Sequence, residues 1–171
     1  MKTIVKILAV LAIVACVVTL FAACNSEEDG DSSDEDDAIG FYITYKDVKI
    51  EIGKSAAGVI EKLGKANDIV EVGNCGDKGS LSQYIYNDVV IELLTDSKGN
   101  KTVDKIILTN DLVSTSKGIS IGDSSEKVLK AYGKATEQTA SKIDYQVGTR
   151  LLRFALKDDG SVKDIYFYDY T

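Results

Sequence analysis

Hydrophobic and polar residues alternate in several short segments after residue 40, and each segment predicts a strand with one buried face. Val48, Ile50 and Ile52 are separated by single polar residues, which is the two-residue period of such a strand. The pairs Asn87-Asp88 and Gly148-Thr149 lie between apolar runs, where they predict hairpin turns. The pattern therefore indicates an antiparallel sheet.

Two segments have a helical period instead. Each carries apolar residues on one helical face: Val59, Ile60 and Leu63 in the first, and Val128, Leu129 and Tyr132 in the second. We expect Ser55 to cap the first helix, and Asp123 with Glu126 to form a capping box at the second. Gly64 and Gly133 follow these apolar faces, where a helix commonly ends in a left-handed residue.

The two helical segments belong to two similar stretches of sequence. Residues 50–66 and 119–135 share eight identities in seventeen positions at an offset of 69. Shorter stretches further along also correspond, at a smaller offset: 91–93 with 152–154, and 103–108 with 162–167. We expect an α+β fold made of two tandem repeats, residues 41–113 and 114–171. Each repeat would pack a helix on an antiparallel sheet, and the two would form one curved sheet.

An apolar segment near the N-terminus predicts export from the cytoplasm. Two lysines precede residues 7–21, which are almost purely apolar and shorter than the roughly 20 residues of a spanning helix. The segment ends in Ala22-Ala23-Cys24, which resembles the lipobox of bacterial lipoproteins. This resemblance implies a signal peptide over residues 1–23 and lipidation of Cys24, with the protein anchored on the extracytoplasmic face of the cell membrane. The alternatives are an uncleaved membrane anchor and a signal peptide with an incidental cysteine.

The residues after Cys24 are strongly acidic. Residues 25–37 contain eight acidic side chains and no apolar one, so we expect residues 24–40 to form a disordered tether behind the lipid. The whole chain has a net charge of −7, and most of that excess lies in this segment. The remaining chain is close to neutral, which argues against a nucleic-acid partner.

The residue composition excludes several kinds of catalysis. The chain has no histidine, which removes Ser-His-Asp and Cys-His catalysis and histidine-containing zinc sites. Cys75, in a glycine-rich loop, is the one cysteine beyond Cys24. It is interpreted as a reactive thiol, as half of an intermolecular disulfide, or as a small buried hydrophobic residue. We expect no enzymatic activity, no cofactor and no metal site.

Tyrosines in the last predicted strand indicate a candidate binding face. Tyr166, Tyr168 and Tyr170 alternate with Ile165 and Phe167, so they are expected on the sheet face away from the helices. Leu151 and Arg153 of the preceding strand are expected on the same side. Tyrosine and arginine are enriched in protein-binding surfaces. The alternative is that the tyrosines pack across strands on a solvated sheet.

The tandem unit resembles a known family. A strand, Ile-Gly, Ser, a helix and Gly-Lys together resemble the repeat of β-lactamase-inhibitor-protein-like lipoproteins of Gram-positive bacteria. The unit is also distantly similar to small outer-membrane assembly lipoproteins. The resemblance covers roughly residues 41–171 and depends mainly on Gly53, Gly64, Gly122 and Gly133. It implies that the open face of a curved sheet binds other proteins.

The sequence therefore predicts a membrane-anchored, non-enzymatic lipoprotein that binds a protein or an envelope component through its open sheet face. The alternative is a structural envelope or assembly scaffold without a high-affinity ligand.

Overall fold

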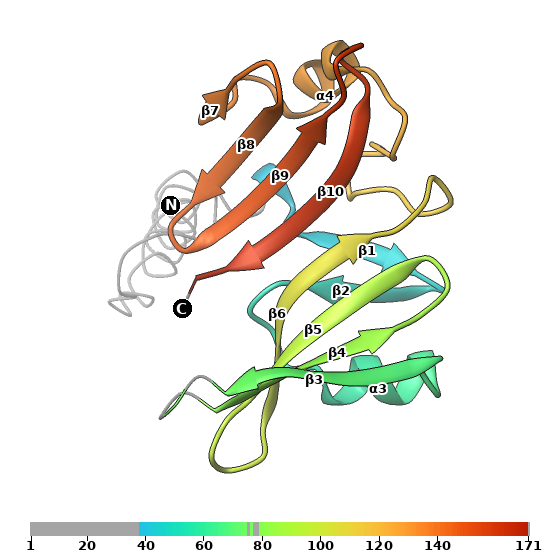
Figure 1. Cartoon of the computed structure of the whole chain (residues 1–171), viewed down its shortest axis with the longest axis vertical. Helices are drawn as coiled ribbons and strands as arrows, with labels where there is room; N and C mark the ends of the chain where they lie inside the picture. The colour runs from blue at the N-terminus through green and yellow to red at the C-terminus, as the bar shows by residue number, and fades with distance from the viewer. Residues whose placement is uncertain (1–37, 75, 77–78, 171) are drawn as a thin grey trace, which may run out of the picture. The chain divides into compact units, whose positions relative to one another are not determined.

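The computed structural model describes residues 38–74, 76 and 79–170, all within one unit, Ser32–Thr171 (Figure 1). A two-stranded hairpin comes first, formed by β1 (Tyr42–Tyr45) and β2 (Val48–Glu51). The helices are α3 (Ala57–Leu63) and α4 (Ser125–Tyr132). Eight strands form the main sheet: β3 (Asp68–Asn74), β4 (Ser80–Ile85), β5 (Val89–Thr95), β6 (Lys101–Leu108), β7 (Glu137–Gln138), β8 (Lys142–Val147), β9 (Arg150–Leu156) and β10 (Val162–Asp169). No helix in the described ranges has the length and apolar character needed to cross a bilayer.

The order of the strands places the end of each half of the chain at the centre of the sheet. The order is β3-β4-β5-β6-β10-β9-β8-β7, and each neighbouring pair is antiparallel. β6 and β10 join the two halves, with Ile165 opposite Leu108 and Phe167 opposite Ile106. The expected α+β class is therefore confirmed, with two helices and an antiparallel sheet accompanied by a hairpin.

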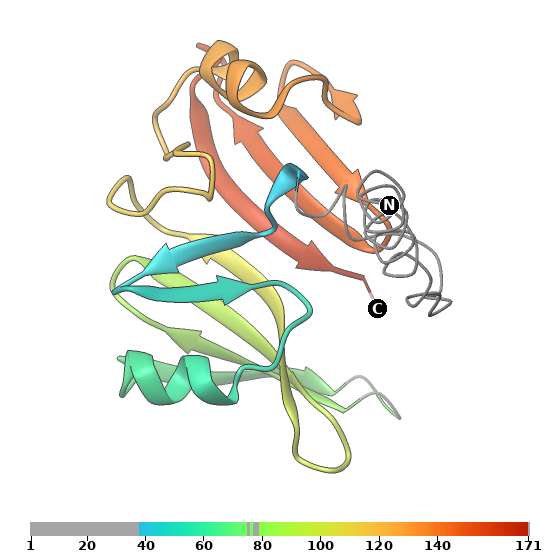
Figure 2. The ribbon, with the colours of Figure 1, turned by 180° about the vertical axis from the view of Figure 1, so that it is seen from behind.

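One face of the sheet carries the core. Figure 2 shows α3, α4 and the β1–β2 hairpin on this face. Ile106, Leu108, Ile165 and Phe167 are each at most 1 % exposed and belong to the same buried cluster as residues of the hairpin and both helices. Fully burying such a side chain contributes about 1.5–3 kcal/mol. The prediction that these four residues face the helices is confirmed.

The first hairpin has no clear sequence signal, because its turn contains no glycine. Lys46 and Asp47 form the turn with φ values of 50° and 61°. Two successive residues with positive φ are typical of a type I′ turn, which matches the twist of antiparallel strands. The turn lets β1 pair with β2 and brings Ile43 and Ile50, both 0 % exposed, into the core. Packing of these side chains compensates for the unfavourable backbone conformation.

The helix ends follow the sequence prediction at their C-termini but not at their N-termini. Gly64 and Gly133 end the helices with φ values of 71° and 78°, as expected. The predicted cap of α3 is wrong, because Ala56 occupies the N-cap position and makes no side-chain cap bond. Ser55 instead forms an isolated bridge with Thr102 of β6.

The predicted cap of α4 is displaced by one residue. Ser124 is the N-cap, and its hydroxyl accepts a hydrogen bond from Lys127 N at 3.3 Å. The Asp123 carboxylate accepts a hydrogen bond from Ser120 N of the preceding loop at 2.8 Å. It also accepts one from Lys127 Nζ of α4 at 2.8 Å. Bonding within the loop therefore decides which side chain caps the helix.

Both halves make the same backbone contacts between the loop before the helix and the last strand. In each half a loop N–H donates to a strand carbonyl, and the N–H of that strand residue donates back to the loop. The bonds are Gly53 N to Val103 O (2.8 Å), Val103 N to Lys54 O (2.9 Å), Gly122 N to Val162 O (2.8 Å) and Val162 N to Asp123 O (2.7 Å).

Two tyrosine hydroxyl groups in the aromatic cluster beneath α4 differ in their hydrogen bonding. The ring of Tyr132 lies 5.1 Å from that of Tyr145 and 5.4 Å from that of Phe154. The Tyr145 hydroxyl donates to Gly133 O at 3.0 Å, at the helix end. The Tyr132 hydroxyl is buried and makes no hydrogen bond to any described residue, although the side chains of Thr115 and Ser116 and the backbone of Lys117 lie close to it.

We predict opposite effects for two matched substitutions in this cluster. Tyr145→Phe should lower the free energy of unfolding by about 1 kcal/mol, because it removes a hydrogen bond to a helix end. Tyr132→Phe should leave it unchanged or raise it by about 1 kcal/mol, because an unsatisfied buried hydroxyl is removed. Urea unfolding of both variants measures the difference. Equal destabilisation by the two substitutions would contradict the prediction.

Candidate functional site

The three C-terminal tyrosines form a stacked row on the sheet face opposite the helices. This face is called the open face, and Tyr166, Tyr168 and Tyr170 are called the tyrosine ladder. Successive ring centroids are 5.8 Å apart in both pairs, and the interplanar angles are 25° and 6°. Tyr166 and Tyr168 are half-buried, whereas Tyr170 is 59 % exposed. β10, one of the two central strands of the sheet, therefore carries Tyr166 and Tyr168, and Tyr170 follows directly after its end.

The stacking determines what the ladder offers to a ligand. Each pair of neighbouring rings covers one another's π-faces, so ring edges and hydroxyl groups are directed away from the stack. Such a row can donate and accept hydrogen bonds along its length. The ring at the end of the row, that of Tyr170, is the most exposed of the three. Burial raises the pKa of Tyr166 and Tyr168, so both phenols are neutral at physiological pH.

A polar cluster lies on one side of the ladder. Lys105 is directly opposite Tyr168 in the sheet, and its Nζ lies 5.3 Å from the centre of the Tyr168 ring. The same ammonium pairs with Glu92 at 3.2 Å, and Gln83 Nε2 donates to Glu92 at 2.7 Å. Glu92 is only 5 % exposed, so its carboxylate stabilises the sheet through these contacts and is not free to bind a ligand.

A second polar cluster lies on the other side. Arg153 is opposite Tyr166, and its Nε and one terminal nitrogen donate to the two oxygens of Asp144 at 2.8 and 2.7 Å. Lys142 Nζ adds a third contact to Asp144 at 3.0 Å. Burial alone would raise the pKa of Asp144, but the hydrogen bonds from Arg153 and Lys142 outweigh it and hold the pKa below its ordinary value. The predicted site residue Arg153 is thus beside the ladder, with its guanidinium occupied by Asp144.

Leu151 is on the expected face of the sheet, but it is buried there and not exposed. It lies opposite Tyr168 in the sheet, as its face predicts, but it is only 4 % exposed. It does not belong to the core cluster on the helix face. Directly opposed side chains in an antiparallel pair lie about 4.5–5.5 Å apart at Cβ, so Leu151 packs beside Tyr168. It can support the ladder but offers almost no surface to a partner.

The two cysteines singled out in the sequence are not among the residues that the structure describes. Cys24, the expected lipidation site, and Cys75, the possible thiol site, lie outside the described residues, as do the predicted signal peptide and most of the predicted tether. Within the described ranges, no cluster of acidic or cysteine side chains has the arrangement of a metal site.

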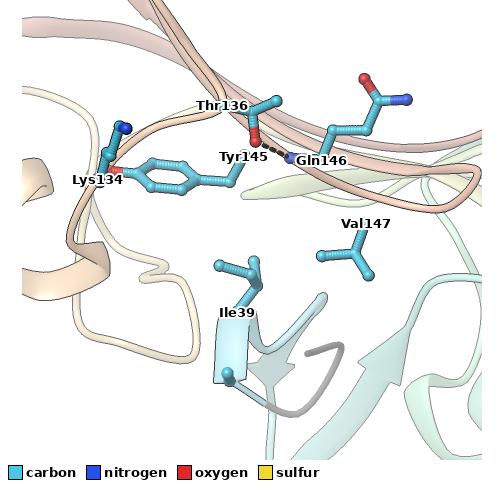
Figure 3. Close-up of a pocket in the computed structure, with 7 residues that line it drawn as sticks. Ile39, Lys134, Thr136, Tyr145, Gln146 and Val147 are labelled. Carbon is cyan, nitrogen blue, oxygen red and sulfur yellow. Dashed lines mark hydrogen bonds between the residues drawn. The ribbon is translucent and has the colours of Figure 1, made fainter. Parts of the chain in front are cut away.

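A pocket of about 280 Å³, which no sequence pattern predicted, lies between the start of the described chain and β8. Figure 3 shows Ile39, Tyr145 and Val147 around it, with Thr136 Oγ1 accepting a hydrogen bond from Gln146 N at 3.0 Å. The other lining residues are Ala38 and Lys134. Lys134 is the one charged side chain among the described lining residues, so these residues alone do not supply a paired acid and base.

Comparison with known proteins gives a likeness of fold. No family model matches the sequence, and no curated protein matches it. The structure resembles that of a cysteine-rich secretory protein from Staphylococcus aureus, with a TM-score of 0.51 and 12 % identity over 70 % of this chain. An extracellular protein containing an SCP domain from Bacillus anthracis matches with a TM-score of 0.42 and 14 % identity over 88 % of this chain. The chain spans 44 % of the first protein and 50 % of the second.

The resemblance to β-lactamase-inhibitor-protein-like lipoproteins, and to small outer-membrane assembly lipoproteins, is wrong. The fold is instead similar to that of the S. aureus secretory protein. The glycines that carried the resemblance explain the error. Gly64 and Gly133 end helices with positive φ, and Gly53 and Gly122 lie in the loops before them. Helix-on-sheet units need such residues in many families, so they identify local structure and not ancestry.

The Arg153–Asp144 contact predicts a pH-dependent effect of Arg153→Met. A carboxylate with a lowered folded-state pKa stabilises the fold above its unfolded pKa of about 3.9, and this contribution is lost as the pH falls through the folded-state pKa. We expect Arg153→Met to lower the free energy of unfolding by about 1–3 kcal/mol at pH 7 and by less at pH 3. Urea unfolding at both pH values measures this.

The matched control is Lys163→Met, because Lys163 is largely exposed and approaches Asp164 only to 3.7 Å. It should change stability by less than about 0.5 kcal/mol at either pH. A loss for Arg153→Met that is the same at pH 3 and pH 7 would contradict the assigned role of the pair.

Proposed function

We propose that this protein is an extracytoplasmic, non-enzymatic binding module that recognises a protein or an envelope component through the tyrosine ladder. The single observation that carries the proposal is the placement of the ladder. Three stacked tyrosines lie along the open face of a central strand and just past its end, and the terminal one is 59 % exposed. Tyrosine supplies large contact area and a hydrogen-bonding tip at low entropic cost, as protein-binding surfaces require.

Differences between the halves support this proposal. We infer that the two halves are copies of one unit, because both have the same helix stops and the same loop-to-strand hydrogen bonds. The copies differ on the open face, where Ile107 and Thr109 occupy the positions of Tyr166 and Tyr168. Retention of the folding residues together with change on one face is what a specialised binding surface on a duplicated scaffold would produce.

The proposed location depends on the N-terminal sequence. The apolar segment and Cys24 support a lipid anchor on the extracytoplasmic face of the membrane. The structurally similar S. aureus protein is itself described as secretory, which agrees with export. Two or three acyl chains hold a protein on a bilayer almost permanently, at about 0.8 kcal/mol per buried methylene.

The alternative function is a structural scaffold in the envelope without a high-affinity ligand. Stacking within the ladder favours this alternative, because the tyrosine rings contact one another and leave less ring surface for a ligand. The two functions differ in what the exposed ring of Tyr170 contacts in the cell.

The lipid anchor predicts a difference between two cysteine substitutions. Cys24→Ala should abolish labelling with radioactive palmitate and release the processed chain from the membrane fraction, because the acceptor thiol is lost. Cys16→Ala, within the apolar segment, is the matched control and should leave labelling intact. Wild-type protein that takes up no palmitate would contradict the anchor.

The binding face predicts a position-specific crosslink. A photoreactive benzoylphenylalanine at Tyr170 should form a discrete adduct on intact cells, and Tyr168→Ala in the same chain should weaken it. The same amino acid at Leu112, which is 77 % exposed in the loop after β6, is the matched control. Adducts identified by mass spectrometry at Tyr170 and not at Leu112 would support a ligand. No adduct at Tyr170, or the same adducts at both positions, would favour the scaffold.

A further inference from the structure

The two outer strands of the sheet differ sharply. β3 ends one side of the sheet with seven residues, and β7 ends the other side with two. β7 is polar, and Glu137 pairs with Lys142 of the neighbouring strand at 2.7 Å. Short, charged outer strands prevent unwanted pairing with other chains. β3 has the length that an added strand needs, whereas β7 does not.

β3 also exposes apolar side chains. Ile69, Val70 and Val72 are 52 %, 38 % and 44 % exposed, and they make up three of the five large exposed hydrophobic residues among those described. Ile69 and Val70 are consecutive, so they lie on opposite faces of the strand. A register shift after Glu71 interrupts the ladder with β4, which leaves Asp68–Glu71 as the regular part of the outer edge. An exposed, apolar edge of this kind is a template for β-strand addition.

We propose that β3 binds an extended segment of a partner protein as an added strand, and that this segment carries two β-branched apolar residues between two basic ones, which would lie opposite Asp68, Ile69, Val70 and Glu71. We infer the basic residues of the partner segment from the acidic charge of the β3 edge. Asp68 and Glu71 are the charged side chains of β3, both are acidic, and neither forms an ion pair with a described residue. Opposite charges on directly paired strands stabilise a sheet, and like charges destabilise it.

A second copy of this chain is a poorer occupant. In a two-fold antiparallel pair centred on Glu71, the two Glu71 carboxylates would lie opposite each other. Centring the pair on Val70 would place Ile69 opposite Glu71 of the other copy. Ile69 would then have no apolar residue opposite it, and Glu71 would have no basic one. Residues 25–37 of the same chain are also excluded by their eight acidic side chains.

The site goes beyond the proposed ladder surface, since β3 lies four strands from β10 in the sheet order. The probe is the peptide Thr-Lys-Val-Val-Lys-Thr with blocked ends, added to the full chain purified in detergent. We expect saturable binding that shifts the amide NMR signals of Asp68–Glu71 and weakens with added salt. Two control peptides are the block sequence Thr-Lys-Lys-Val-Val-Thr and the version of the probe with glutamate in place of lysine. Both should bind at least about tenfold more weakly, because they lack the spacing of the basic residues or their charge.

Val70→Lys tests the edge directly and should weaken peptide binding by about tenfold, because it adds a positive charge to the edge. Leu112→Lys is the matched control and should bind as the wild type does. Urea unfolding of Val70→Lys confirms that the edge variant is folded. Equal binding of the block peptide, or shifts confined to residues outside β3, would overturn the proposal. A concentration-dependent dimer in sedimentation velocity that Val70→Lys abolishes would overturn it in favour of self-pairing.

Discussion

The antiparallel pairing of β6 with β10 is the interaction on which the rest of this structure depends. Each strand ends one half of the chain, and their union makes eight strands into one sheet. On the helix face it brings Ile106 beside Phe167 and makes the core continuous across the two halves. On the open face it places Lys105 beside Tyr168, so the ladder acquires its polar neighbour from the other half of the chain. The ladder therefore has Lys105 of the first half on one side and Arg153 of its own half on the other.

The open face is held by buried carboxylates as well as by backbone pairing. Glu92 and Asp144 are each at most 5 % exposed. Glu92 of β5 bridges to Gln83 of β4 and Lys105 of β6, and Asp144 of β8 bridges to Arg153 of β9. Removing a charge from water costs of the order of several kcal/mol, so these contacts must be complete to be tolerated. They fix the strands on both sides of the ladder. Polar residues beside the tyrosines consequently support the surface, while the tyrosines themselves are available to contact a partner.

Regular patterns in the sequence predicted much of the fold, whereas features set by tertiary contacts were missed. Alternation identified the strands and correctly placed Ile165 and Phe167 on the core face, and glycines marked both helix ends. The Lys46-Asp47 turn gave no signal, because packing of the hairpin and not local preference selects its conformation. For the site, the period of two gave the correct face for Leu151 but not its burial, which depends on the neighbouring strand. The family assignment failed because it depended on residues that serve folding.

Native-state hydrogen exchange at the junction of the two halves tests the central claim most directly. If β6 and β10 unite the halves into one cooperative sheet, the amides of Ile106, Ile107, Ile165 and Tyr166 should exchange only through global unfolding. Their exchange free energies would then equal the free energy of unfolding obtained with urea. Exchange of these amides through a lower-energy opening, while the strands within each half stay protected, would show that the halves unfold independently and would contradict the account.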